Sequence, residues 1–416
     1  MSLTAFQVLG GVIALVAVFG YFNHRFVKLP DAIGITAIGV VVSIAAILVG
    51  RVDASLAPAV RHVIAGFDFP GTLLHGVLGL LLFAGSLHIQ ADDIAKEKWL
   101  ILVLSTVGVI VSTAIVGAAF FAVTQWLGLG VPLLYCLLFG ALISPTDPVA
   151  VLAVIRRVGV PKSLETRIAG ESLFNDGTGV VVFLTLLALA ASGTRVDVGA
   201  TALLFATEVV GGTLYGLAVG YLGFRMLRSI DSYAVEILIT LALATAGYAV
   251  AEAIHVSAPI AVVLMGLIVG NRGKREAMSD QTQQRLFDFW QVLDELLNLL
   301  LFGLVGLQMM TLTFSAARLA AAACAIVIVL IARLVSVSGP LLATPRLRLL
   351  RGPAIAIMTW GGLRGGISIA LALSLPEFGG REAVISSTYA VVIFSILVQA
   401  LTLRRVIARV LPATRR

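Results

Sequence analysis

The chain has 416 residues, of which 59% are hydrophobic and only 12% are charged, and its mean hydropathy is +1.06. Soluble domains carry about 25% charged residues, so the composition excludes a soluble globular protein and predicts a polytopic membrane protein. The formal net charge of +7 is compatible with a nucleic-acid partner, but the placement of the basic residues argues against one.

Apolar segments long enough to cross a bilayer, about 20 residues each, follow one another along the whole chain. The loops between them are short, and no soluble domain is inserted. Thirteen transmembrane helices are predicted, at about 5–22, 29–50, 72–89, 99–125, 131–155, 164–191, 201–225, 232–254, 257–271, 286–308, 315–337, 350–375 and 382–406.

An odd number of helices places the two termini on opposite sides of the membrane. One set of loops holds 23 of the 29 Lys and Arg residues, Arg333 among them, the other set holds 5, and Arg364 lies within the membrane. Because cytoplasmic loops are enriched in Lys and Arg, we expect an N-terminus outside and a C-terminus in the cytoplasm of a multi-pass protein of the cell (inner) membrane. The basic excess then reflects topology, with anionic lipid head groups as its expected partner.

Two of the predicted helices are interrupted. The fifth contains SPTDP (144–148), in which each proline removes a backbone donor, and the twelfth contains GGLRGG (361–366), in which four glycines flank a charge. Helices five and twelve run in opposite directions, as two inverted six-helix repeats (1–6 and 8–13) require. Paired interrupted helices in the two halves of a transporter indicate a binding site at the membrane midplane.

The sixth helix carries the polar stripe GESLFNDG (170–177) in an otherwise apolar segment. Glu171 and Asn175, and likewise Ser172 and Asp176, are stacked at i,i+4. The four side chains share an arc of roughly 140°. Ionisable residues inside a membrane are functional candidates by default; the alternative is a structural ion pair that locks helices together.

These residues supply hard oxygen ligands at the expected crossing of the broken helices. A buried carboxylate without a counterion is too costly, so we expect Asp176 to hold either a proton or a metal cation, with Thr146 and Ser172 as further ligands. Oxygen ligands favour alkali or alkaline-earth ions. Asp147 and Arg364 are expected to compensate the helix ends, and Glu171 to pair with Arg364. One titrating aspartate implies one cation per proton, which is an electroneutral exchange. We expect a transporter and not an enzyme, and no cofactor.

Three segments, SPTDPVAV (144–151), GESLFNDGTGVVVF (170–183) and GGLRGGISIALAL (361–373), resemble the NhaP/NHE branch of the monovalent cation/proton antiporters. The resemblance implies Na⁺ (or Li⁺)/H⁺ exchange at Asp176, Ser172 and Thr146, with Asn175 holding the broken helix. It implies that Glu171 and Arg364 form an interhelical ion pair and that Asp147 compensates a helix dipole. An Asn-Asp pair, here Asn175-Asp176, marks the branch regarded as electroneutral.

The resemblance also implies a homodimer working as an elevator. Helices 1–3 and 7–10 would form the dimerisation scaffold, and helices 4–6 (about 99–191) and 11–13 (about 315–406) the ion-transporting core.

One position departs from that pattern. Some members of the family carry a glutamate in the third helix, whereas this chain has Ala84 there, in LLLFAGSLHIQ. Water or Ser86 is expected in its place, and K⁺/H⁺ exchange is therefore the nearest alternative. Asp294, Glu295 and Asn298 in the tenth helix either face an aqueous funnel and tune the pH response or bond to neighbouring helices.

Two alternatives belong to other classes of protein. An intramembrane aspartyl protease would use Asp147 and Asp176 as paired carboxylates, but Arg364 and Glu171 would disturb the shared proton. A cation channel would use a fixed pore, to which inverted, interrupted helices are poorly suited. Peptide-independent, saturable and gradient-reversed transport would distinguish an exchanger from both.

Overall fold

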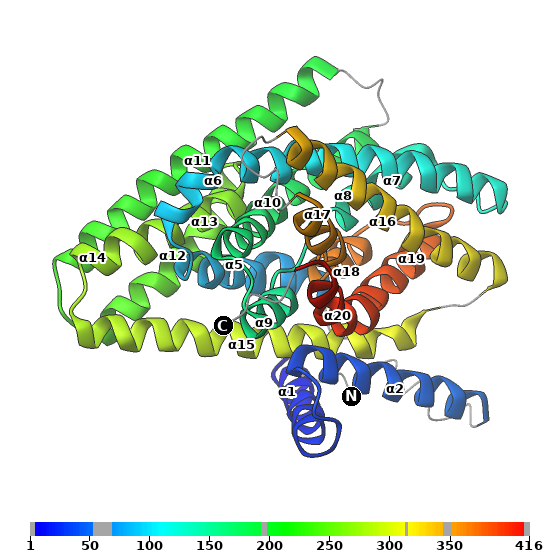
Figure 1. Ribbon diagram of the computed structural model, residues 1–416, viewed down its shortest axis with the longest axis horizontal. Helices are drawn as coiled ribbons and strands as arrows, with labels where there is room; N and C mark the ends of the chain where they lie inside the picture. Colours follow the sequence, from blue (N-terminus) through cyan, green and yellow to red (C-terminus); the bar gives the residue numbers. More distant parts are fainter. Residues whose placement is uncertain (1–4, 53–68, 193–197, 313–314, 344–350, 412–416) are drawn as a thin grey trace.

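The computed structural model describes residues 5–52, 69–192, 198–312, 315–343 and 351–411. All of its regular elements are helices (Figure 1). The elements of the first half are α1 (Ala5–Phe22), η1 (Asn23–Val27), α2 (Asp31–Val52), α4 (Phe69–Thr72), η2 (Leu73–Val77), α5 (Leu78–Leu87), α6 (Ala91–Ser105), α7 (Val107–Trp126), α8 (Leu133–Ile143), α9 (Val149–Val158) and α10 (Lys162–Ser192).

The second half begins with a helix as long as α10. Its elements are α11 (Val198–Arg228), α12 (Tyr233–Ala253), α13 (Ala258–Ile268), η3 (Val269–Gly273), α14 (Lys274–Glu276), α15 (Asp280–Gln308), η4 (Met309–Thr311), α16 (Ala316–Ala343), α17 (Arg351–Trp360), α18 (Gly366–Leu373), α19 (Arg381–Phe394), η6 (Ser395–Ala400) and α20 (Leu401–Val410).

Each of the thirteen predicted spans coincides with helical structure. Within the described residues, nine helices are long and apolar enough to cross a membrane. The remaining spans contain short or interrupted helices: 72–89, 131–155, 257–271 and 350–375. The fold class is therefore the predicted one, an all-α polytopic membrane protein with discontinuous helices.

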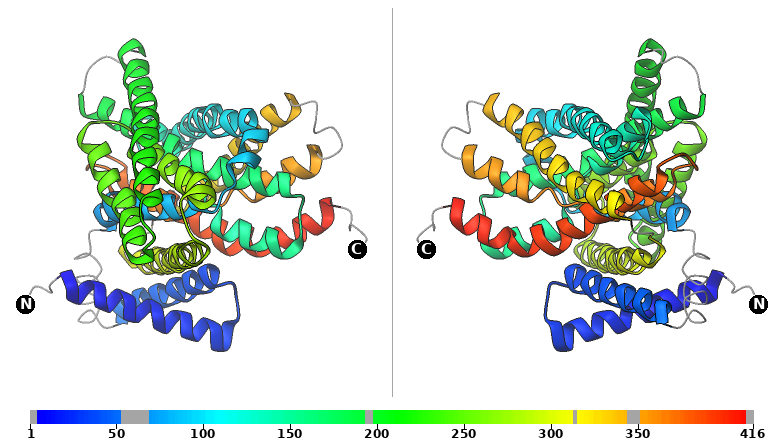
Figure 2. Two further views of the ribbon diagram at one scale, coloured as in Figure 1. Left: turned by 90° about the vertical axis from the view of Figure 1, so that its left-hand side faces the viewer. Right: turned by 90° about the vertical axis from the view of Figure 1, so that its right-hand side faces the viewer.

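The helices pack in two groups. In one, α7, α8, α10, α16 and α19 lie against each other; in the other, α2 packs on α15, while α13 packs on α5, α11 and α12. α1 and α2 lie beneath α15 in all three views (Figures 1 and 2). Within the described part of the chain, α10 contacts both α11 and α13, which joins the groups.

Small residues permit the close contacts within each group. A Cβ at Gly216 of α11 would lie 2.7 Å from the Cα of Ala261 in α13, and one at Gly140 of α8 would lie 3.0 Å from the Cα of Thr113 in α7. Helix association in a membrane depends on such backbone approach because lipid tails are as apolar as the side chains they replace.

Hydroxyl side chains and a left-handed glycine mark several helix ends. Ser257 and Ser279 cap α13 and α15, accepting bonds from the amides of Ile260 and Thr282 at 3.4 Å. Gly159, with φ of 78°, ends α9 in the left-handed conformation that glycine adopts most readily.

Candidate functional site: the crossing of two interrupted helices

The two interrupted helices meet where they are broken. Residues 144–148 separate α8 from α9, and residues 361–365 separate α17 from α18. The Asp147 amide donates to the Leu363 carbonyl at 2.9 Å, which joins the first break to the second. The crossing predicted from the prolines and glycines is therefore present in the fold.

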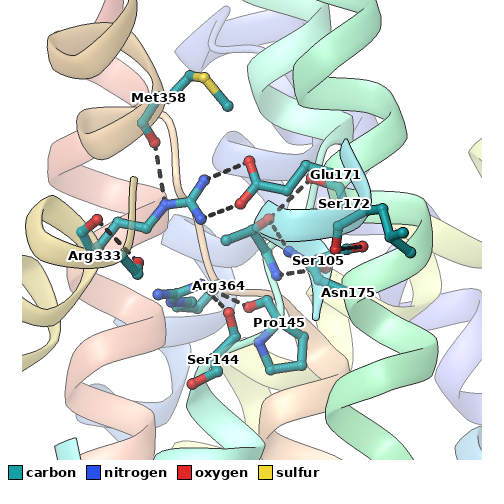
Figure 3. A network of polar contacts seen from close by, with 12 residues as sticks. Ser105, Ser144, Pro145, Glu171, Ser172, Asn175, Arg333, Met358 and Arg364 are labelled. Atoms are coloured by element: carbon teal, nitrogen blue, oxygen red, sulfur yellow. Dashed lines mark hydrogen bonds and ion pairs between the residues drawn. The ribbon is translucent and has the colours of Figure 1, made fainter. Parts of the chain in front are cut away.

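Two charged side chains face the helix ends at this crossing. The Asp147 carboxylate accepts a bond from the Val149 amide at 2.9 Å, at the N-terminus of α9. The Arg364 guanidinium donates to the carbonyls of Ser144 and Pro145, both at 2.8 Å, at the C-terminus of α8 (Figure 3). A negative charge thus lies at a positive helix end and a positive charge at a negative one.

The polar stripe on α10 contacts the same break. The Asn175 side chain accepts from the Thr146 amide at 3.3 Å and donates to the Thr146 hydroxyl at 2.9 Å. The hydroxyls of Thr146 and Ser172 lie 3.0 Å apart. All three residues are buried, so their side chains satisfy the unwound backbone and one another.

Asp176 is the member of the stripe that reaches a cavity. Its side chain and that of Asp147 line a space of about 1060 Å³, which extends to Lys28 and Arg156. Asp176 is 8% exposed, and no hydrogen bond to its carboxylate comes from the residues that the structure describes. Within those residues, no group of three or more His, Cys, Asp and Glu side chains could hold a metal ion.

The partner predicted for Glu171 is wrong. Both oxygens of the Glu171 carboxylate accept from Arg333 of α16, one of them from Nη2 at 2.9 Å (Figure 3). Arg333 Nε also donates to the Met358 carbonyl at 3.3 Å. Arg364 instead donates from Nη1 to the carbonyls of Ser144 and Pro145. Each arginine therefore has its own hydrogen-bond acceptors.

Arg333 is the site residue that sequence reasoning missed. The count of basic residues places it among the cytoplasmic loops, although position 333 falls within the predicted span at about 315–337; in the structure it lies inside α16 and is 7% exposed. The signal was present, because the arginine interrupts an apolar run that includes IVIVLIARLV (326–335). The rule applied to Glu171, that a charge inside a membrane segment needs a partner, applies equally to Arg333.

Six basic residues that entered the topology prediction lie outside the described residues: Arg61, Arg195, Arg346, Arg348, Arg415 and Arg416. Moving Arg333 into the membrane removes one residue from the side with the large basic excess. The predicted orientation therefore does not depend on it.

In the third span, neither position 84 nor position 86 supplies a side-chain oxygen to the cavity. The α5 residues that line the cavity are Leu78, Leu81, Leu82 and Gly85, followed by His88 and Ile89 just after the helix, and neither Ala84 nor Ser86 lines that space. The Ser86 hydroxyl donates to the Phe83 carbonyl at 2.8 Å. Ser86 therefore does not replace the missing carboxylate.

The polar residues of the tenth span do line the cavity. Asp294, Glu295 and Asn298 of α15 are all part of its wall. The Asn298 amide donates to the Asp294 carboxylate at 3.1 Å and to the Asp294 carbonyl at 2.9 Å. These bonds are within one helix, and among the described residues no hydrogen bond joins the three side chains to a neighbouring helix, which is what the second alternative requires.

Comparison with known proteins agrees with this architecture. A family model described as "Sodium/hydrogen exchanger, transmembrane" matches residues 12–409. The chain is 44% identical to the Na⁺/H⁺ antiporter NhaP of Pseudomonas aeruginosa over 96% of this chain and 95% of that protein. It is 33% identical to the Na⁺/H⁺ antiporter NhaH of Halobacillus dabanensis, over 92% of this chain and 93% of that one.

A solved structure has the same fold. The sodium proton antiporter MjNhaP1 of Methanocaldococcus jannaschii superposes with a TM-score of 0.72 over 98% of both chains, at 18% identity. Together with the match of the family model along nearly the whole sequence, this shows that the chain belongs to the sodium/hydrogen exchanger family.

Proposed function

We propose that this protein is a secondary antiporter that exchanges Na⁺ (or Li⁺) for H⁺. The observation that carries the proposal is Asp176, a buried carboxylate on the wall of a large cavity, without a hydrogen bond from the described residues and beside the crossing of two interrupted helices. The names of the two relatives, both Na⁺/H⁺ antiporters, support the same reaction.

Competition for Asp176 provides the coupling. A buried carboxylate requires a neutralising partner, and a proton and a Na⁺ ion exclude each other at one carboxylate. The hydroxyls of Thr146 and Ser172 bond to each other, and Na⁺ would use their oxygens in place of that bond. Glu171 has its own countercharge in Arg333, which leaves Asp176 as the exchanging carboxylate, so we propose one cation per proton.

Alternating access completes the cycle. The cavity reaches Lys28 and Arg156, both on the side that the positive-inside rule assigns to the cytoplasm. We propose that the described conformation faces inward, and that residues 99–191 and 315–406 move as the core against the remaining helices in a homodimer. We also propose that the exchange needs no cofactor and that the transported cations are monovalent.

The nearest alternative changes only the ion. The cavity face of α5 carries no carboxylate. The site therefore has one carboxylate fewer than in family members with a glutamate in the third helix, and K⁺ is the alternative cation. An aspartyl protease is disfavoured because the Asp147 carboxylate is engaged by the Val149 amide and so is not free to share a proton symmetrically with Asp176.

Dissipation of a pH gradient in proteoliposomes, with the membrane potential clamped, tests the proposal. We expect saturable responses to Na⁺ and Li⁺, reversed when the cation gradient is reversed and independent of the imposed potential. A response to K⁺ alone would show that the transported cation is K⁺ and not Na⁺. A dependence of the rate on the imposed potential would contradict electroneutral exchange, and no response to any of the three cations would refute the proposed antiport.

A further inference from the structure

One part of the cavity wall belongs to α15. Gln291, Asp294, Glu295, Asn298 and Leu301 line it at helical spacing, and Leu301 continues this face to the crossing. There it packs so closely on Gly366, the first residue of α18, that a Cβ on Gly366 would meet the Leu301 side chain. A polar stripe on α15 therefore leads from the open cavity toward the two broken helices.

Asp294 is the member of this stripe whose carboxylate is held in place. It is half-buried, and the buried Asn298 amide donates to its Oδ1 at 3.1 Å. One turn before it, the Trp290 ring lies 4.7 Å from the Phe83 ring of α5, which anchors this part of α15 on its neighbour. Glu295, by contrast, is exposed and accepts a bond from Gln291.

Acidic side chains outnumber basic ones on the wall of the cavity. Its lining includes the carboxylates of Asp31, Asp147, Asp176, Asp294 and Glu295, against the fixed positive charges of Lys28 and Arg156. The Arg156 side chain is paired with Glu165 at 2.7 Å. An excess of acidic groups in a cleft raises the local concentration of cations. Asp176, which is 8% exposed and receives no hydrogen bond from the described residues, lines the same cleft.

From this arrangement we infer that Asp294 is a positioning and affinity-determining residue for the cation, acting on ions that approach Asp176 from the cytoplasmic side. The inference rests on the proposed function. It assigns to α15 the second carboxylate that α5 does not offer. Because α15 lies in the group of helices proposed to stay fixed, Asp294 and Asp176 face the same cavity only when the core faces inward. The contribution of Asp294 is therefore one-sided.

The test is the variant Asp294→Asn in everted membrane vesicles, whose exposed face is the cytoplasmic one. We expect the apparent KM for Na⁺ to rise about threefold to tenfold at low ionic strength, the factor for losing one unit charge across an aqueous cavity, with the maximal rate within about twofold of wild type. Asp294→Glu should restore the affinity.

The matched control is Asp288→Asn. Asp288 is exposed on the same helix and is absent from the cavity wall, so its loss should leave the KM unchanged. Added choline chloride should shrink the effect of Asp294→Asn, because salt screens charges across water, and right-side-out vesicles should show no rise in KM.

Three results would overturn the inference while wild-type exchange is intact. They are an unchanged KM in Asp294→Asn, a rise of equal size on both faces, and a rise that is insensitive to salt, which would indicate a structural role. A wild-type protein that exchanges no cation would instead refute the proposed function, and the inference with it. Na⁺-dependent heat stabilisation of the purified protein gives a second reading of affinity, which should weaken in Asp294→Asn alone.

Discussion

Two acidic residues five positions apart on α10 have opposite surroundings. Glu171 is 1% exposed and is bonded through both oxygens to Arg333, whereas Asp176 faces the cavity and receives no hydrogen bond from the described residues. A carboxylate in a bidentate pair with arginine is held in its charged form, while an unpaired one must exchange protons or cations with the solvent it meets. The two environments support the structural role proposed for Glu171 and the transporting role proposed for Asp176.

Asp176→Asn tests the transporting role. The amide has the shape of the carboxylate but carries no negative charge to balance a cation and takes up no proton near neutral pH, so we expect exchange to fall to the background of empty liposomes. Removing an unpaired buried charge costs the fold nothing, and the melting temperature in detergent should stay at or above that of wild type. Exchange near the wild-type rate would refute the assignment.

Glu171→Gln tests the structural role. The Arg333 guanidinium, with a side chain 9% exposed, would be left without its countercharge, and breaking a buried pair in this way costs about 3–5 kcal/mol. We expect a clear drop in melting temperature in detergent. The exposed pair Arg156–Glu165 provides the control: Glu165→Gln should cost less than about 1 kcal/mol. Equal melting temperatures for the two variants would contradict this role.

At the scale of the element, the broken helices depend on compensation of their ends. α8 ends at Ile143 and α9 begins at Val149, so carbonyls and amides that a continuous helix would pair lie free inside the protein. Arg364 takes the carbonyls, Asp147 takes an amide, and Asn175 bonds to Thr146 in between. The break persists because three different segments supply what the helix has lost.

Arg364→Met tests this compensation. Two buried carbonyls, those of Ser144 and Pro145, would lose their donor, and each unsatisfied group costs about 1–3 kcal/mol. We expect a lower melting temperature together with loss of exchange, because the crossing is the proposed ion site.

Arg381→Met is the matched control for that variant. Arg381 also donates to two carbonyls, those of Leu373 and Leu375, but at the end of α18 away from the crossing. It should lose stability while retaining exchange. If both variants retained exchange equally, the crossing would not be the site.

For the whole molecule, the predicted topology determines which way the cavity faces. The cavity reaches Lys28, in the loop after the first helix, and the loop at Glu377 lies between the last two predicted spans. With the predicted topology these loops are on opposite sides of the membrane, cytoplasmic and external respectively.

Thiol labelling tests that orientation. Arg25 is exposed beside Lys28, and the Glu377 side chain is 89% exposed. With Cys136 and Cys324 replaced, we expect an impermeant maleimide to label Arg25→Cys only in everted vesicles and Glu377→Cys only in right-side-out ones. The reverse pattern would place the cavity outside and invert the proposed direction of access.

The sequence by itself determined every feature that depends on residue order. Hydropathy located the helices, Pro145 and Pro148 located the first break, the glycines around Arg364 the second, and i,i+4 spacing placed Glu171, Ser172, Asn175 and Asp176 on one face of α10. These follow from backbone stereochemistry and the lipid environment, which act locally.

Only the tertiary structure decided which charges meet. Glu171 and Arg333 are 162 positions apart, and sequence shows that both need a partner without showing which of two buried arginines serves. Packing likewise turned Ala84 and Ser86 away from the cavity and placed Asp294 on its wall. Pairing and exposure depend on how whole helices are rotated and stacked, and that is set by contacts between segments far apart in the chain.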